Sequence, residues 1–223
     1  MNGALYERDA ERFLDTVAPL PDDLPIRATP DWTLLQLIAH LTGGAADLAE
    51  LNLEAAAEPG RTGTQVAQRA GRSRDELAAE WRGHVPRVAQ ILNDPGAVAL
   101  SDVFARRALL DITCHEADVR ESAELPLVVD DDDWVVVGAH RQWVLDNDVT
   151  AAGLAALSIS TPEGDAWTVG SGDATARLVV SRYELWRSLM GRRTRAEVRG
   201  YEWSVDPDPY IAVWVSGNFD WPE

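Results

Sequence analysis

The stretch DWTLLQLIAHLTGGAADLAE, Asp31 to Glu50, decides how the N-terminal half of the chain folds. Its apolar residues recur at the three- and four-residue spacing of an amphipathic helix. Asp31 follows a proline and precedes the first apolar residue, so we expect it to cap this helix at its N-terminus. The pattern predicts a long helix that runs toward Ala57, weakened only at Gly43 and Gly44 and broken by the following EPGRTGTQ.

Three further segments of the N-terminal half have the same periodicity. One runs from about Ala4 to Val17 and ends at the proline-rich PLPDDLPIRATP. Another follows a capping box formed by Ser73 and Glu76, and the last begins near Ser101. Four amphipathic helices joined by polar loops predict an antiparallel four-helix bundle.

The sequence beyond Pro126 has a different texture. A helix is predicted from about Asp132 to Leu145, and then LAALSIS and DAWTVG flank a PEG turn as a hairpin, with ATARLVV as a third strand. We interpret RYELWRSLMGRR as a helix that stops at Gly191, TRAEVRG as a short helix, and the tail YIAVWVSGNF as a last strand. The fold class is therefore α+β, with a bundle over residues 1–125 and a small α+β domain over residues 126–223.

Composition excludes several classes of partner. Asp and Glu number 37 against 20 Lys and Arg, a net charge of -17 over 223 residues, which repels nucleic acid and anionic membrane surfaces. The longest apolar runs fall well short of the about 20 residues that cross a bilayer. A single cysteine, Cys114, excludes an internal disulfide and agrees with a reducing compartment. We expect a cytoplasmic protein with small-molecule partners, without nucleic acid or membrane contacts.

The segment RALLDITCHEADVRES places Asp111 and His115 four residues apart on one face of a predicted helix. Both side chains can then reach one metal ion, but the same spacing serves a plain ion pair, and Arg107 can also pair with Asp111. The candidate third ligand is His40, which lies among apolar residues of the Asp31–Glu50 helix. The alternative for His40 is a core histidine satisfied by a backbone or carboxylate partner.

A Trp32–Thr33 pair opens the second helix and His40 follows, and a later helix carries Asp111, His115 and Asp118. With the segment YELWRSLMGRR near the C-terminus, these motifs resemble the DinB-like metalloenzyme superfamily, in particular its mycothiol-dependent maleylpyruvate isomerase branch from actinobacteria. In that family an acidic residue, a histidine and an aspartate follow the same pattern, and the segment YELWRSLMGRR resembles the second domain. The family commonly has Glu where this chain has Asp111, which is one methylene shorter, so metal affinity or the preferred ion could differ.

The resemblance implies a metal site made of His40, Asp111 and His115, with open coordination positions for a thiol. Zinc is the expected divalent ion, although nickel, iron or manganese suits the same ligands. Mycothiol is the implied thiol cosubstrate, and Trp32 and Asp118 border the site, Asp118 as a partner of an imidazole or as a surface charge. Arg192 and Arg193 are candidate catalytic groups for a carboxylate substrate, or they complement a helix C-terminus.

Two functions remain open at this point. The first is a mycothiol-dependent isomerase or S-transferase that activates a low-molecular-weight thiol for addition to a small electrophile. The second is a non-catalytic small-molecule-binding or stress-associated protein on the same scaffold. The presence of both histidines favours the enzyme, and Asp111 in place of Glu favours the binding protein.

Overall fold

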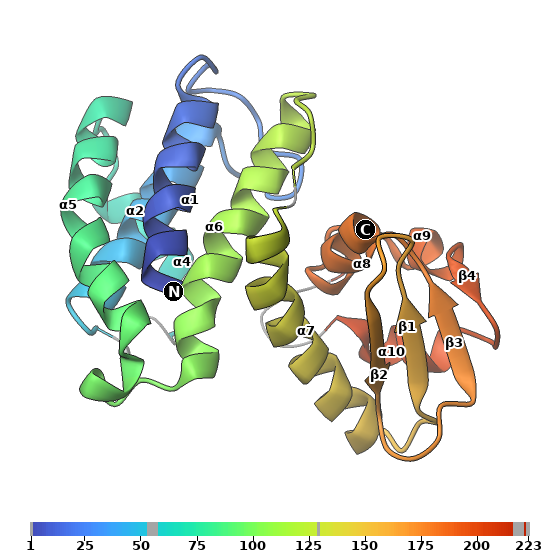
Figure 1. The fold of residues 1–223 in the computed structure, drawn as a ribbon. Helices are drawn as coiled ribbons and strands as arrows, with labels where there is room; N and C mark the ends of the chain where they lie inside the picture. Colours follow the sequence, from blue (N-terminus) through green and yellow to red (C-terminus); the bar gives the residue numbers. More distant parts are fainter. Residues whose placement is uncertain (1, 53–57, 129, 216–220, 222–223) are drawn as a thin grey trace. The chain divides into compact units, whose positions relative to one another are not determined.

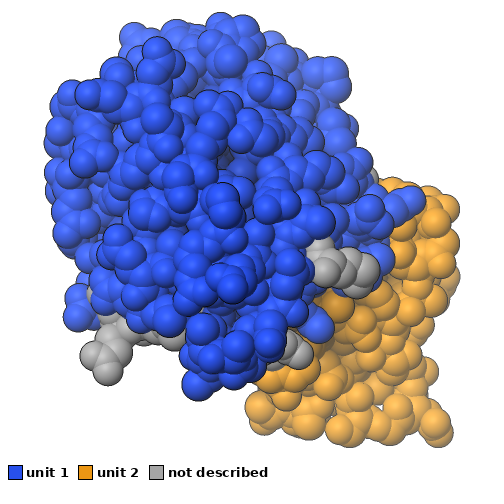
Figure 2. All heavy atoms as spheres, turned by 60° about the vertical axis from the view of Figure 1, so that its left-hand side comes forward, with its two compact units in different colours: residues 1–136 blue, residues 137–223 orange. Residues whose placement is uncertain are grey.

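Figure 1 shows the fold in a computed structural model that describes residues 2–52, 58–128, 130–215 and 221. The chain forms two compact units, residues 1–136 and 137–223, coloured separately in Figure 2. The first unit is helical, and the second contains helices and a four-stranded sheet, so the protein is α+β as predicted. The predicted domain boundary at residues 125 and 126 lies before helix α7 and stays a prediction.

The first unit is built around four helices that share one core. The structure gives α1 as Asn2–Val17, α2 as Leu34–Ala49, α5 as Arg74–Asn93 and α6 as Asp102–Ser122, with a short 3-10 helix, Pro95–Val98, before α6. Helix α5 packs against α1 and α2, and α6 packs against the same two helices. None of the described helices is long and apolar enough to cross a membrane.

The bounds of α2 differ from the predicted ones. Thr33, not Asp31, caps the helix, because its hydroxyl accepts the backbone N–H of Gln36 while the Gln36 side chain accepts the backbone N–H of Thr33. The helix ends at Ala49, and Leu51 adopts a left-handed conformation with φ of 58°. Residues 53–57 of the predicted extension lie outside the described residues.

The segment EPGRTGTQ was predicted only as a break, and this was wrong. Residues Arg61–Gln68 form a separate short helix, α4, which packs against α2. Two glycines and a proline in the quoted stretch favoured a loop. Contact with α2 buries Gln65 and stabilises the helix in spite of this composition.

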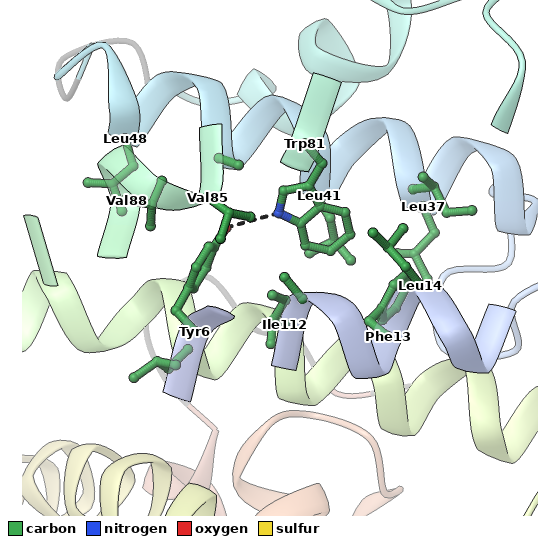
Figure 3. Close-up of a cluster of buried hydrophobic side chains, with 14 of the residues drawn as sticks. Tyr6, Phe13, Leu14, Leu37, Leu41, Leu48, Trp81, Val85, Val88 and Ile112 are labelled. Atoms are coloured by element: carbon green, nitrogen blue, oxygen red, sulfur yellow. Dashed lines mark hydrogen bonds between the residues drawn. The ribbon is translucent and has the colours of Figure 1, made fainter. Parts of the chain in front are cut away.

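Large side chains fill the core between these helices (Figure 3). The rings of Phe13 on α1 and Trp81 on α5 lie 5.5 Å apart, and both side chains are fully buried. The indole N–H of Trp81 donates a hydrogen bond of 3.2 Å to the Tyr6 hydroxyl, so this polar group is satisfied inside the core. Ile112 of α6 belongs to the same core, which places the next turn of α6 against α2.

Buried charges tie α1 to the start of helix α7, Asp131–Ala151. The guanidinium of Arg12 lies 2.8 Å from Glu116 on α6, 2.7 Å from Asp130 and 3.0 Å from Asp133. Asp9, whose side chain is fully buried, accepts from Arg8 and faces Arg12 at 3.3 Å. Burial and the nearby Asp133 raise the pKa of Asp9 to about 7. This carboxylate is therefore costly to ionise.

We expect the substitution Asp9→Asn to favour folding more at pH 8 than at pH 5. The pKa of Asp9 rises from 3.8 to about 7 on folding. Between these values the folded protein holds a proton that the unfolded chain lacks, so the wild type loses stability as the pH rises toward 7. Asn cannot ionise, so the Asp9→Asn variant does not lose stability in this way as the pH rises. Urea unfolding of both proteins at the two pH values measures the difference, with Asp15→Asn, an exposed carboxylate on α1, as the control. An equal effect at both pH values would contradict the prediction.

The second unit contains a sheet with strand order β2-β1-β3-β4. The strands are β1, Leu157–Ser160; β2, Ala166–Val169; β3, Ala176–Val179; and β4, Glu202–Trp203. Strands β1 and β2 form the predicted antiparallel hairpin, and β3 runs parallel to β1. Helices α8, Arg182–Leu189, and α9, Arg195–Arg199, confirm the two predicted helices after β3.

The tail was predicted as a strand, and this was wrong. Residues Asp208–Trp214 form helix α10. Pro209 in the first turn favours the start of a helix, and Tyr210, Ile211 and Trp214 are buried at helical spacing. The indole N–H of Trp214 also donates to the Ser188 hydroxyl at 2.9 Å. Residues 216–219 of the predicted strand lie outside the described part of the chain.

Candidate metal centre

Helices α2 and α6 bring three titratable side chains together. The Nε2 atom of His40 lies 3.4 Å from Oδ2 of Asp111, and Nε2 of His115 lies 3.5 Å from Oδ1 of the same carboxylate. One ligand atom from each residue lies within 4.8 Å of the others, and the two imidazole rings meet edge to face at 5.2 Å. Asp111 and His115 share a face of α6, as their spacing predicted, and the packing of α2 on α6 adds His40.

These distances fit a divalent ion. Zinc binds imidazole nitrogen and carboxylate oxygen at about 2.0–2.2 Å, so tetrahedral ligand atoms lie about 3.4 Å from one another. The distance from Oδ2 of Asp111 to His40 and that from Oδ1 to His115 are each of this size, and one ligand atom from each of the three residues lies within 4.8 Å of the others. Two imidazoles and a carboxylate are also the donor set of catalytic zinc sites, in which a further position stays open.

The second nitrogen of each imidazole already has an acceptor. Nδ1 of His115 lies 3.0 Å from Oδ2 of Asp118, and Nδ1 of His40 lies 2.7 Å from Oε1 of Gln65. Both acceptors are buried. Each Nδ1 therefore carries a proton, and Nε2 is the nitrogen of each ring that faces Asp111. A metal ligand needs this arrangement, in which Nε2 can give up its own proton and bind the ion.

The charges of the cluster support one another. Loss of water would raise the pKa of Asp111, but the positive charge and hydrogen bond of His40, with smaller contributions from His115 and Arg107, lower it to about 2. Burial would lower the pKa of His40, but Asp111 outweighs this effect and raises it. In the structure Asp111 pairs with both histidines, and the charge of Arg107 also lowers its pKa. A divalent cation would supply the positive charge that this carboxylate attracts.

One side of the cluster reaches solvent. The side chains of His40 and His115 are 7% and 9% exposed, whereas that of Asp111 is 43% exposed. Trp32 covers His40, with the two rings 5.3 Å apart. The exposed part of Asp111 therefore leaves one side of the cluster in contact with solvent, as an open coordination position requires.

The remaining predicted residues lie in different surroundings. Asp118 is buried behind His115, which removes the alternative of a surface charge. Arg193 donates through Nε and Nη2 to the carboxylate of Glu184 at 2.7 and 2.8 Å, and Arg192 donates to the carbonyl of Met190. Both arginines lie just after α8 in the second unit, so the second of these contacts agrees with the alternative of a helix C-terminus. Their catalytic roles stay predictions.

Three residues near the cluster were missed in the sequence. Gln65, Asp47 and Arg61 form a hydrogen-bonded chain that ends on His40. Asp47 lies seven residues after His40, which is the same face of α2, so its position was a usable signal. Gln65 and Arg61 fall in EPGRTGTQ, where nothing in the local pattern marks a buried amide.

Comparisons with known proteins agree with this arrangement. Residues 6–120 match the family model of the mycothiol maleylpyruvate isomerase N-terminal domain. The fold is similar to a crystal structure of the mycothiol-dependent maleylpyruvate isomerase, with a TM-score of 0.56 and 15% identity over 92% of each chain. A His-to-Ala mutant of the isomerase gives the same TM-score and coverage at 14% identity. No curated protein matches the chain.

Proposed function

The chain belongs to the mycothiol maleylpyruvate isomerase N-terminal domain family, and from this premise we propose that it is a metal-dependent enzyme that uses mycothiol. Its reaction is the addition of the thiol to a small electrophile, as an isomerase or as an S-transferase. The observation that carries this proposal is the cluster of His40, Asp111 and His115, in which both Nε2 atoms face one partly exposed carboxylate.

His40, Asp111 and His115 would hold the divalent ion, with zinc as the expected metal. When bound, such an ion lowers the pKa of a thiol that reaches it, so that the thiolate is present at neutral pH. Asp118 accepts the Nδ1 proton of His115 and so keeps that imidazole oriented. Trp32 excludes water from one side of His40, and the exposed side of Asp111 leaves room for the thiol and the electrophile.

The thiolate sulfur adds to an electrophilic carbon of the substrate. For an isomerase, addition to a carbon–carbon double bond leaves a single bond that can rotate, and elimination of the thiol then restores the double bond in the other geometry. For an S-transferase, the adduct takes up a proton and leaves. Both reactions share the first step, and the residues around Asp111 serve that step in either case.

The shorter side chain at position 111 is compatible with this role. Asp111 reaches both imidazoles at similar distances, 3.4 and 3.5 Å, so the missing methylene does not prevent a three-residue ligand set. We also interpret α1, α2, α5 and α6 as a DinB-like antiparallel four-helix bundle. Arg192 and Arg193 of the second unit are kept as candidates for binding a carboxylate substrate.

The function is tested by metal and thiol dependence together. Untagged protein is dialysed with zinc, and its metal content is measured by mass spectrometry. Isomerisation of maleylpyruvate and loss of free thiol with a generic electrophile are then followed with mycothiol and, separately, with other thiols. We expect a rate that needs both metal and mycothiol. His84→Ala is the matched control, because His84 on α5 lies near Glu80 and outside the cluster.

A metal-loaded protein without any rate above background for these thiols and metals would overturn the enzyme. That result would favour the alternative function, a non-catalytic protein that binds small molecules on the same scaffold. A thiol-dependent reaction rate that persists without metal would instead contradict the proposed role of His40, Asp111 and His115 as ligands of a catalytic ion.

A further inference from the structure

We propose that Gln65 is a positioning residue for His40, held in its orientation by Asp47 and Arg61. The amide fixes the proton of His40 on Nδ1 and leaves Nε2 as the nitrogen that faces Asp111. This role rests on the proposed function, because it matters when Nε2 of His40 binds a metal. The hydrogen bonds that support this role join side chains of the protein and do not depend on a bound metal.

The chain of contacts starts at a fixed charge. Arg61 donates to both oxygens of Asp47, through Nε at 2.9 Å and through Nη2. Burial would raise the pKa of Asp47, but Arg61 and Gln65 outweigh this and lower it. Asp47 is therefore a carboxylate and can only accept hydrogen bonds.

The carboxylate decides how the Gln65 amide lies. Nε2 of Gln65 is 2.6 Å from Oδ2 of Asp47, and only the NH2 end of the amide can donate there. Oε1 of Gln65 must then face His40, whose Nδ1 lies 2.7 Å away. A carbonyl oxygen can only accept, so Nδ1 of His40 must carry a proton. The reversed amide would place two acceptors against each other at Asp47.

Without Gln65 the neutral imidazole of His40 would hold its proton more favourably on Nε2 than on Nδ1. Nε2 of His40 lies 3.4 Å from Oδ2 of Asp111, and a protonated Nε2 would be attracted to this charged acceptor. That tautomer occupies the nitrogen that a metal needs. His115 has a carboxylate, Asp118, directly on Nδ1, whereas the neutral amide of Gln65 stands between His40 and the charge of Asp47. The choice of the ring nitrogen of His40 that carries the proton consequently depends on the orientation of the Gln65 amide.

Gly43 allows this amide to approach. A Cβ atom on Gly43 would lie 2.6 Å from Cβ and 2.7 Å from Cγ of Gln65, closer than such atoms can come. Gly43 follows His40 by three residues on α2, so the face that carries the imidazole also has the gap for α4. A Cβ on Gly44 would come no closer than 3.9 Å to any side chain outside its own helix, the nearest atom being Oδ2 of Asp111.

The test compares two pairs of variants. Gln65→Leu removes both hydrogen bonds at similar size, and Gln68→Leu changes an exposed glutamine of the same helix as its control. Gly43→Ala pushes α4 away from α2, and Gly44→Ala is its control, because both changes favour the helix equally.

For each protein, zinc affinity is measured by competition with a chromophoric chelator, and thermal unfolding checks the fold. The ring nitrogens of His40 are assigned by 15N NMR in metal-free protein at alkaline pH.

We expect Gln65→Leu and Gly43→Ala to bind zinc about 10- to 100-fold more weakly than the wild type, with the two control variants unchanged. In metal-free wild type the proton of His40 is expected on Nδ1, and in Gln65→Leu it moves to Nε2. A purely structural role of Gln65 would lower the unfolding temperature and leave the tautomer as it was.

The result that overturns this role is a metal-free wild type with the His40 proton on Nε2, or a Gln65→Leu variant with unchanged tautomer and affinity. Failure of the proposed function has a different signature. In that case the wild type binds no zinc, while the tautomer of His40 still shows whether Gln65 positions it. The wild-type measurement does not depend on the folding of any variant.

Discussion

Replacement of His115 by alanine is expected to abolish stoichiometric zinc binding while the protein stays folded. His115 contributes one of two imidazoles to the cluster, and Asp111 and His40 alone leave at most two ligands. Loss of a residue that only supports a ligand weakens metal sites by about 10- to 100-fold, and loss of the ligand itself should exceed this. Metal content per chain after dialysis against trace zinc measures the effect.

The control separates this loss from damage to the fold. His84→Ala removes a histidine outside the cluster and should retain the zinc content of the wild type. His115 is buried beside Asp118, so circular dichroism and thermal unfolding of His115→Ala should accompany the metal analysis. A folded His115→Ala protein that retains one zinc per chain would mean that the ion binds elsewhere, and the cluster would then be an ion pair of histidines with Asp111.

The second large effect concerns the core of the first unit. We expect Trp81→Ala to destabilise the protein by about 3–5 kcal/mol, because it removes a fully buried indole and leaves a cavity beside Phe13. It also removes the donor to the Tyr6 hydroxyl. Guanidinium unfolding followed by circular dichroism measures the change in the free energy of unfolding.

Trp143 on α7 provides a matched tryptophan, since 53% of its surface is exposed. Trp143→Ala should change stability by no more than about 0.5 kcal/mol, as is usual for surface positions. If Trp81→Ala cost less than about 1 kcal/mol, the packing of α1 against α5 around this indole would be wrong. The loss of stability in Trp81→Phe should lie between those of Trp143→Ala and Trp81→Ala, because phenylalanine keeps most of the side-chain volume but loses the hydrogen bond to Tyr6.

Local signals explain which elements could be predicted from the sequence. Ser73 and Glu76 form the predicted capping box, and the PEG turn joins the predicted hairpin strands, because in both cases the decisive groups lie within a few residues of each other. The same holds for the pairing of Asp111 with His115 across one helical turn.

Elements that depend on distant contacts could not be predicted in this way. The short helix α4 exists where α2 provides a surface with Gly43, and the burial of Gln65 depends on His40, 25 residues earlier. In the tail, the aromatic and β-branched residues of YIAVWV favour a strand, and only the packing that buries Tyr210, Ile211 and Trp214 selects the helical period. His40 was placed among the ligands by family resemblance, and only the packing of α2 on α6 brings it to Asp111.

The buried charges around Arg12 have a practical consequence for dissecting the protein. A recombinant fragment that stops at residue 125 would keep Arg8, Arg12 and Asp9 but lose Asp130 and Asp133, two carboxylates that pair with these arginines. A fragment extended to residue 136 retains both acceptors and the buried Val136. The longer fragment is therefore the better starting point for expressing alone the half that contains the candidate metal centre.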